Sequence, residues 1–240
     1  MVCQDFLNNS LISPMKQKII RIIAVLLISL SFTAVKAQTV KDINGNVYKT
    51  VTIGTQTWMA ENLKTTMYTD GTAIPFVADN IAWINHDSVA IITPAYYWYS
   101  NDSTYKNVYG ALYNWYVLKT NKLCPTGWHV PNDAEWQILT DYLGGESVAG
   151  GKLKETGYTH WTTPNYGATN ETGFNALPGG TRFMDGIFML INEGGNWWSS
   201  SEYNSERAWF RGMNNNIEIV IKGPLEKPNG ISVRCVKDEN

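Results

Sequence analysis

The chain has 240 residues and a formal net charge of −2 at pH 7. This length suits one domain with a leader rather than several domains. The mildly acidic balance, with no run of basic residues, argues against nucleic acid and anionic membrane as partners.

The first 37 residues have the layout of a secretory signal peptide behind a short polar leader. From Met15, which we take as the true start, three basic residues precede the apolar run 22–30, and Val35-Lys36-Ala37 forms a small-residue cleavage signal. The apolar run is too short for a membrane span, so we expect cleavage after Ala37. An uncleaved anchor is the alternative. No further membrane span is expected in the mature chain.

The mature chain begins with a stretch, residues 40–63, that has the pattern of β-strands. The alternation over 47–52 predicts one strand, and the turn signal Asn44-Gly45 precedes it. A second strand is expected through Trp58.

Two helices are expected further along, after a polar loop region at 65–108. The spacing of apolar residues predicts a short helix over 110–118. Asn132 is a good N-cap for a second helix, because Glu135 stands where its side chain can reach back to the backbone amide of the cap. Apolar residues then recur at helical spacing until a pair of glycines.

Residues 150–230 consist of short segments separated by glycine turns about ten residues apart. That spacing is too short for βαβ units and predicts antiparallel strands joined by ordered loops. No linker and no fixed-period repeat interrupts the pattern. We therefore place a single domain at 38–240.

The cysteines point to a structural role. Cys3 lies in the leader, so the mature chain keeps Cys124 and Cys235. An even number of cysteines in an exported protein favours a disulfide. It would close a loop of about 110 residues and contribute about 4–5 kcal/mol to stability. Two buried free thiols are the alternative.

Seven short motifs occur in an order typical of one known family. They are VTIGTQTWMAENL, YGALYNW, CPTGWHVPNDAEW, GGKLKE, TGFNALPGG, WWSSSE with a following arginine, and ISVRCVKD. Together they resemble the Fibrobacter succinogenes major paralogous domain family over nearly all of the mature chain. The resemblance implies an exported or surface protein of Bacteroidetes-type or Fibrobacter bacteria, with a largely undefined biochemical function.

Three segments are also similar, more distantly, to the formylglycine-generating enzyme and sulfatase-modifying group. They are HVPNDAEW, WWSSSE and ISVRC. This similarity implies an α+β, C-type-lectin-like fold with short antiparallel strands, about two helices and long ordered loops. C-type lectin domains tie an early helix region to the last strand by a long disulfide, and Cys124 and Cys235 would fit that pattern.

The sequence contains no recognisable catalytic constellation. Formylglycine-generating enzymes use a late pair of redox-active cysteines, whereas only Cys235 is late here. The histidines His86, His129 and His160 lie in different segments without metal-ligand spacing. No G-x-S-x-G motif is present. We expect His129 to be a packed or capping residue with no partner.

Aromatic residues supply the candidates for a binding surface. The chain has 10 tryptophans and 13 tyrosines, and exposed rings of this kind stack on sugars. Trp197 and Trp198 are adjacent, so on a strand one would face solvent. Packing in the core is the alternative for each ring. The candidate ligand-binding residues are Trp83, Trp98, Tyr99, Asn101, Asp102, Trp197, Trp198, Glu202 and Arg207.

Calcium is the single cofactor considered, as a structural ion, because loop carboxylates and amides are its usual ligands. Candidate oxygens belong to Asn101, Asp102, Asn170 and Glu171. We expect a secreted or cell-surface binding domain without catalytic activity, with a glycan or surface polymer as ligand. A structural or adhesive protein that binds other proteins is the alternative, and an enzyme of unknown class comes third.

Overall fold

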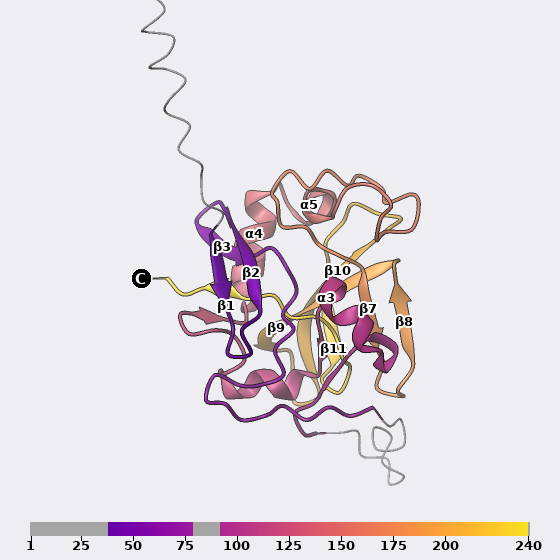
Figure 1. Cartoon of the computed structure of the whole chain (residues 1–240). Coiled ribbons are helices and arrows are strands. Elements are labelled where there is room, and N and C mark those ends of the chain that lie inside the picture. The colour runs from indigo at the N-terminus through magenta and orange to yellow at the C-terminus, as the bar shows by residue number, and fades with distance from the viewer. Residues whose placement is uncertain (1–37, 79–91, 240) are drawn as a thin grey trace, which may run out of the picture. The chain divides into compact units, whose positions relative to one another are not determined.

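Figure 1 shows the computed structural model of the chain, in which residues 38–78 and 92–239 are described. Residues from Gln38 onward form one compact unit. The expected leader and signal peptide lie outside the described residues. Within the two described ranges, no helix is long and apolar enough to cross a membrane.

One five-stranded sheet joins the two ends of the domain, and all its neighbouring strands are antiparallel. The predicted turn at Asn44-Gly45 connects its first two strands. Gly45 has a φ of +85°, and its amide donates to the carbonyl oxygen of Asp42 at 3.0 Å. The predicted N-terminal strands are confirmed. In spatial order the strands are β1 (Thr39–Lys41), β2 (Val47–Ile53), β3 (Gln56–Met59), β12 (Val236–Lys237) and β6 (Trp128–His129).

A second five-stranded sheet is formed by the chain after residue 178. Three of its four pairings are antiparallel, whereas β7 runs parallel to β9. In spatial order the strands are β11 (Ile221–Glu226), β10 (Arg207–Asn214), β9 (Gly194–Glu202), β7 (Gly179–Arg182) and β8 (Phe188–Ile191).

The other described elements are short. The helix predicted after Asn132 is confirmed, and it is followed directly by a second one. The remaining elements are β4 (Tyr96–Tyr97), η1 (Tyr99–Asn101), η2 (Ser103–Tyr105), α3 (Lys106–Tyr109), β5 (Leu112–Tyr113), η3 (Trp115–Thr120), α4 (Asp133–Tyr142) and α5 (Glu146–Leu153).

The helix predicted over 110–118 is wrong. β5 pairs with β4 instead, and only η3, a 3-10 helix, follows. Gly110 explains part of the difference. Its φ is +76°, and a Cβ atom there would lie 2.7 Å from the carbonyl oxygen of Leu63. The backbone is therefore in a left-handed conformation, pressed against a neighbouring segment, where a helix cannot pass through it.

The expected α+β class with long ordered loops is also wrong, and no solved structure matches that would support the C-type-lectin-like fold. The described chain is mostly β, because two five-stranded sheets dominate it and its three α-helices have only 4, 10 and 8 residues. Glycine turns separate aromatic and β-branched segments, and such segments favour strands buried between packed faces. The sheets, rather than long loops between helices, carry the architecture.

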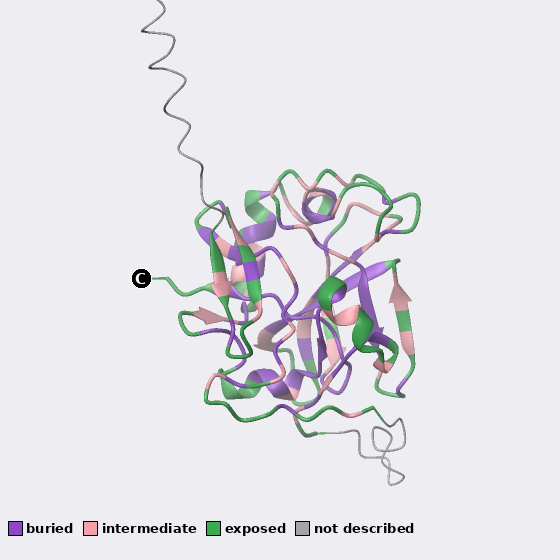
Figure 2. Ribbon diagram, in the orientation of Figure 1, coloured by how far each residue is buried: buried purple, intermediate pink, exposed green. Residues whose placement is uncertain are grey.

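Strand β9 runs through the middle of the core and is covered on both faces. Trp197 and Trp198 are both 0% exposed and belong to two different hydrophobic clusters. Trp197 packs in the cluster that contains Trp136 of α4, whereas Trp198 packs in the cluster that contains the cysteines. Figure 2 shows that β9 and neighbouring β7 are buried along much of their length. Neither tryptophan of β9 is therefore available to a ligand.

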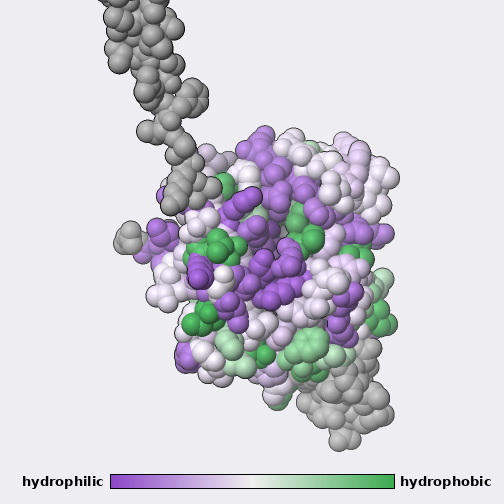
Figure 3. Space-filling model, in the orientation of Figure 1, coloured by the Kyte–Doolittle hydropathy of each residue, from purple (hydrophilic) through white to green (hydrophobic). Residues whose placement is uncertain are grey.

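The expected disulfide is present. Cys124 and Cys235 are bonded, with their Cα atoms 6.0 Å apart and a sequence separation of 111. Both residues are buried in the cluster that contains Trp198. The bond ties the segment before β6 to the segment before β12, two strands that also pair with each other. Figure 3 shows that one face of the molecule is largely hydrophilic and hollowed near its centre.

Candidate functional site

The candidate site begins at the N-terminus of α4, where both halves of the predicted capping box form. The Asn132 side-chain oxygen accepts from the Glu135 amide at 2.9 Å, and the Glu135 carboxylate accepts from the Asn132 amide at 2.8 Å. This exchange satisfies two amides that a helix start leaves unpaired. It also fixes the Glu135 carboxylate in one position beside β6.

His129 on β6 lies between two carboxylates, so the expectation that it has no partner is wrong. Its Nε2 atom is 2.7 Å from Glu135, and its Nδ1 atom is 2.6 Å from Asp238. Pairing of β6 with β12, with His129 opposite Val236, brings Asp238 to this side of the ring. The imidazole therefore joins the start of α4 to the segment that follows β12. We call His129, Glu135 and Asp238 the clamp.

The two carboxylates set the charge of His129. The hydrogen bond to Glu135 raises the pKa of His129 to about 9, and the bond to Asp238 adds to this against the opposing effect of burial. Burial favours the neutral form of Glu135, but its hydrogen bonds with His129 and the Asn132 amide lower the pKa of this carboxyl. At neutral pH His129 is therefore an imidazolium that donates from both nitrogens. A ring in this state has no lone pair with which to accept a proton as a general base.

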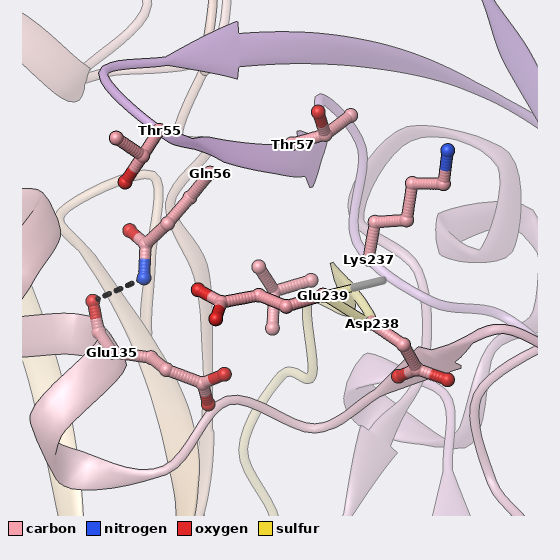
Figure 4. A pocket seen from close by; sticks show the side chains of 8 residues that line it. Thr55, Gln56, Thr57, Glu135, Lys237, Asp238 and Glu239 are labelled. Carbon is pink, nitrogen blue, oxygen red and sulfur yellow. Dashed lines mark hydrogen bonds between the residues drawn. The ribbon is translucent and has the colours of Figure 1, made fainter.

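A cleft of about 450 Å³ opens beside the clamp. In Figure 4 the Glu239 carboxylate extends toward Gln56 and Glu135, whereas Lys237 points away from them. The Gln56 amide donates to the backbone carbonyl of Glu135 at 3.1 Å, which joins β3 to α4 across the cleft. The lining residues are Thr55, Gln56, Thr57, Glu135, Val236, Lys237, Asp238 and Glu239.

The cleft presents hydroxyl, amide, ammonium and carboxylate groups, with Val236 as its apolar member. The Thr55 and Glu239 side chains are exposed to solvent, so their polar groups can reach a ligand in the cleft. Such a lining can both donate hydrogen bonds to a polar ligand and accept them from it. Across the described ranges, no group of three or more His, Cys, Asp and Glu side chains is arranged to hold a metal ion.

The predicted aromatic candidates lie elsewhere and are buried. Trp98 is 7% exposed and Tyr99 is 8% exposed, and both tryptophans of β9 are fully buried. The indole N–H groups of β9 are already used: Trp197 donates to Asn62 at 2.8 Å, and Trp198 donates to the Tyr113 carbonyl oxygen at 2.8 Å. These four rings form core, as the alternative interpretation held. The remaining candidate ring, Trp83, lies outside the described residues.

The polar candidates already have partners within the protein. Asn101 donates to the Ala78 carbonyl oxygen at 2.9 Å, and Asp102 accepts from the Thr104 amide at 2.8 Å. Glu202 lies 3.3 Å from Lys227, and Arg207 lies 2.9 Å from Glu226. Asn101 and Asp102 are adjacent, and Glu202 and Arg207 both contact the end of β11 from the paired strands β9 and β10. All four side chains are therefore engaged by protein groups.

The two other calcium candidates also have protein partners. Asn170 has a φ of +46°, and its side-chain oxygen accepts from the Asn175 amide at 2.9 Å. The Glu171 carboxylate lies 3.2 Å from Lys152. Both residues therefore stabilise a loop with the oxygens that calcium would need.

One exposed aromatic pair is absent from the candidates that the sequence suggests. Tyr203 is 51% exposed, and its ring packs edge-on against Trp209 with 5.0 Å between centroids. The Lys222 ammonium lies 5.1 Å from the centroid of Trp209. The alternation of Trp209 with buried Ala208 could have indicated that Trp209 faces outward. Its partners could not be foreseen, because Tyr203 lies in a turn and Lys222 lies on β11. The two rings are nearly perpendicular, so they do not offer a flat stacking platform.

The comparisons with known proteins agree with the motifs. A family model described as the Fibrobacter succinogenes major domain matches residues 51–237. Comparison with curated proteins and with solved structures finds no match. The matched segment contains the whole clamp except Asp238, together with most of the cleft lining.

Proposed function

Because the chain belongs to the Fibrobacter succinogenes major domain family, whose motifs here form the core and the clamp, we propose that it is an exported protein that binds its ligand without converting it. The ligand is a glycan or another cell-surface polymer. The site is the cleft beside His129. The observation that carries the proposal is the polar lining of this cleft, beside which His129 is held as an imidazolium by two carboxylates of that lining.

The lining suits a polyhydroxylated ligand. Sugar hydroxyls both donate and accept hydrogen bonds, and the cleft is lined by the threonine hydroxyls of Thr55 and Thr57 and by the Glu239 carboxylate. Binding is favoured over catalysis because His129, the strongest candidate for an acid–base group here, is protonated at neutral pH and engaged on both nitrogens.

Export is supported by the covalent chemistry of the chain. The Cys124–Cys235 disulfide is of the kind that persists in oxidising compartments. The predicted signal peptide, with cleavage after Ala37, would deliver the protein there. Mass spectrometry of the protein from the native culture medium or cell surface should find Gln38 at its N-terminus.

The binding proposal is tested on a glycan array that includes plant, host and bacterial surface polysaccharides. The double variant Thr55→Val/Glu239→Gln removes one hydroxyl and one carboxylate from the cleft. Thr162→Val/Glu206→Gln makes the same chemical changes at exposed positions that do not line the cleft. We expect the unaltered protein and the control pair to bind the same subset of glycans, and the cleft pair to lose it.

If the unaltered protein binds no glycan on the array, the proposed ligand class is contradicted. Equal binding by the cleft pair and the control pair would contradict the site. Repeating the array with a chelator separates direct binding from calcium-dependent binding, since a calcium-held ligand would dissociate in the chelator.

A specific surface favours the alternative, an adhesive protein that binds other proteins. Strand β8 lies at the edge of its sheet, and Met189 on it is 51% exposed, next to Ile187 at 54%. An edge strand with exposed apolar side chains can pair with a strand of another chain. Light scattering of the unaltered protein and of Met189→Lys tests this: a lower mass for the variant would support assembly through β8.

A further inference from the structure

A second cleft, of about 260 Å³, lies among the segment after β3, helix α3 and the loops near residues 160 and 175. Its volume is below the usual range of about 300–1,000 Å³ for drug-sized ligands, so it suits a single small unit. The hydrophilic, hollowed surface at the centre of Figure 3 belongs to the face that presents β2 and α3. The residues that matter for its chemistry are Glu61, Lys64, Lys106, Asn107, His160 and Asn175.

The floor of this cleft is held rigidly by Asn62, which uses both ends of its amide. Its oxygen accepts from Arg234 at 2.7 Å and from Trp197 at 2.8 Å. Its nitrogen donates to the Tyr109 carbonyl oxygen at 2.9 Å and to Ser232 at 3.2 Å. Separate segments of the chain therefore meet at one buried side chain. A site with a fixed floor loses little conformational entropy when it binds a ligand.

The cleft carries positive charge on a protein that is acidic overall. Lys64 and Lys106 line it, and within the described ranges neither forms an ion pair with a carboxylate. In the free protein each ammonium rests over a ring outside the cleft lining: that of Lys64 lies 5.8 Å from the centroid of Tyr48, and that of Lys106 lies 5.4 Å from the centroid of Trp98. Two lysines that line one concave site and have no carboxylate partner concentrate positive potential there and attract an anion.

Amides, an imidazole and a carboxylate complete the lining. Asn107 and Asn175 bring amides to the cleft, and His160 is oriented by Glu155, which lies 2.8 Å from its Nδ1 atom. The Nε2 atom of His160 has no hydrogen-bond partner in the described part of the chain. Glu61 contributes a carboxylate, one oxygen of which accepts from the Lys49 amide at 2.9 Å.

We propose that this second cleft binds one carboxylated sugar unit, a hexuronate, of an acidic polysaccharide. The two lysines bind the carboxylate through charge-assisted hydrogen bonds. The amides, Nε2 of His160 and the second oxygen of Glu61 bond the ring hydroxyls, which need both donors and acceptors. Val108 and Leu177 add apolar surface for the face of the sugar ring.

An acidic peptide is the competing ligand, but the lining favours the sugar. An aspartate or glutamate side chain would use the lysines alone and would leave the Glu61 carboxylate facing another acid. A hydroxylated ring gives each lining group a partner. The inference rests on the proposed function in taking the protein to bind a polymer, but it assigns a different site and a charged unit.

The test measures binding by calorimetry with three probes at low ionic strength: tri-galacturonate, its fully methyl-esterified form, and a short poly-glutamate. Methyl esterification removes the charge and keeps the sugar. The cleft variant Lys64→Gln/Lys106→Gln is compared with Lys41→Gln/Lys49→Gln, which makes the same charge change on exposed positions of β1 and β2.

We expect tri-galacturonate to bind at least about tenfold more tightly than its ester, since charge-assisted hydrogen bonds are roughly twice as strong as neutral ones. The cleft variant should lose this preference, and the control variant should keep it. Binding of tri-galacturonate should also weaken as sodium chloride is added.

Equal binding of the acid and the ester, an unchanged preference in the cleft variant, or absence of tri-galacturonate binding would each overturn the inference. Tighter binding of poly-glutamate that is lost in the cleft variant would reassign the site to acidic peptides. The proposed function fails separately, because it concerns neutral hydroxyl contacts that Thr55→Val/Glu239→Gln removes while leaving both lysines of the second cleft in place.

Discussion

The clamp around His129 predicts a stability that depends on pH, which the variant His129→Gln can reveal. The folded state raises the pKa of His129 from 6.5 to about 9. A group whose pKa is raised by folding contributes stability that is fully present below the unfolded pKa and is lost as pH rises through the folded pKa. The contribution of the clamp should therefore be complete at pH 6 and absent by pH 10.

The magnitude follows from the same two values. One pKa unit corresponds to about 1.36 kcal/mol, so the difference between 6.5 and about 9 gives at most about 3.4 kcal/mol. The His129 side chain is 38% exposed, and solvent screens a pair of that exposure strongly. We therefore expect about 1 kcal/mol from the clamp at pH 6, in the upper part of the range for exposed ion pairs.

The assay is urea unfolding followed by tryptophan fluorescence at pH 6 and at pH 10. His129→Gln should be less stable than the unaltered protein by about 1 kcal/mol at pH 6 and equally stable at pH 10. Glu135→Gln is the matched control. Glutamine can replace glutamate at this position of a capping box, and the substitution removes only the negative charge. It should reproduce the loss at pH 6. Equal losses at both pH values would mean that His129 acts by packing, and the electrostatic reasoning would be refuted.

The remaining predictions concern the covalent bond, a buried amine and calcium. Replacing Cys124 and Cys235 by alanine should lower the free energy of unfolding by about 4–5 kcal/mol, measured in urea; an unchanged midpoint would contradict this. Lys154 is fully buried and donates to three backbone carbonyl oxygens at 2.8–2.9 Å. Lys154→Met should therefore lower the free energy of unfolding by about 3 kcal/mol. Lys152→Met, at a half-buried position, is the control. A chelator should leave the melting temperature unchanged, because Asp102 and the other calcium candidates already bind protein groups. A lower melting temperature in the chelator would show a bound ion.

Local signals predicted local structure. The Asn132 cap and the Asn44-Gly45 turn were predictable because each depends on residues within a few positions of one another. The segment at 110–118 was not, since β5 takes its partner from β4, which lies earlier in the chain, and Gly110 is pressed against a distant backbone. Periodicity alone cannot report a partner that lies elsewhere in the chain.

The candidate sites were less predictable than the fold, because each is assembled from distant segments. The pair Trp197 and Trp198 was expected to place one ring in solvent, but alternation tells only that two rings lie on opposite faces. It cannot tell that both faces are covered. His129 finds one partner six residues away and another 109 residues away. The second cleft likewise takes its lining from several separate stretches.

The disulfide has a consequence wherever the protein meets proteases. It joins residues 124 and 235, so the bridge encloses the segment that contains α4, α5 and the whole second sheet. A single cut within that segment would leave the two fragments covalently attached, and the buried strands around the cut would continue to hold them in register. A nicked molecule would therefore run as one band without reductant and as two with it. After cleavage of one peptide bond in an exposed turn of this segment, the protein would still be one covalently linked molecule.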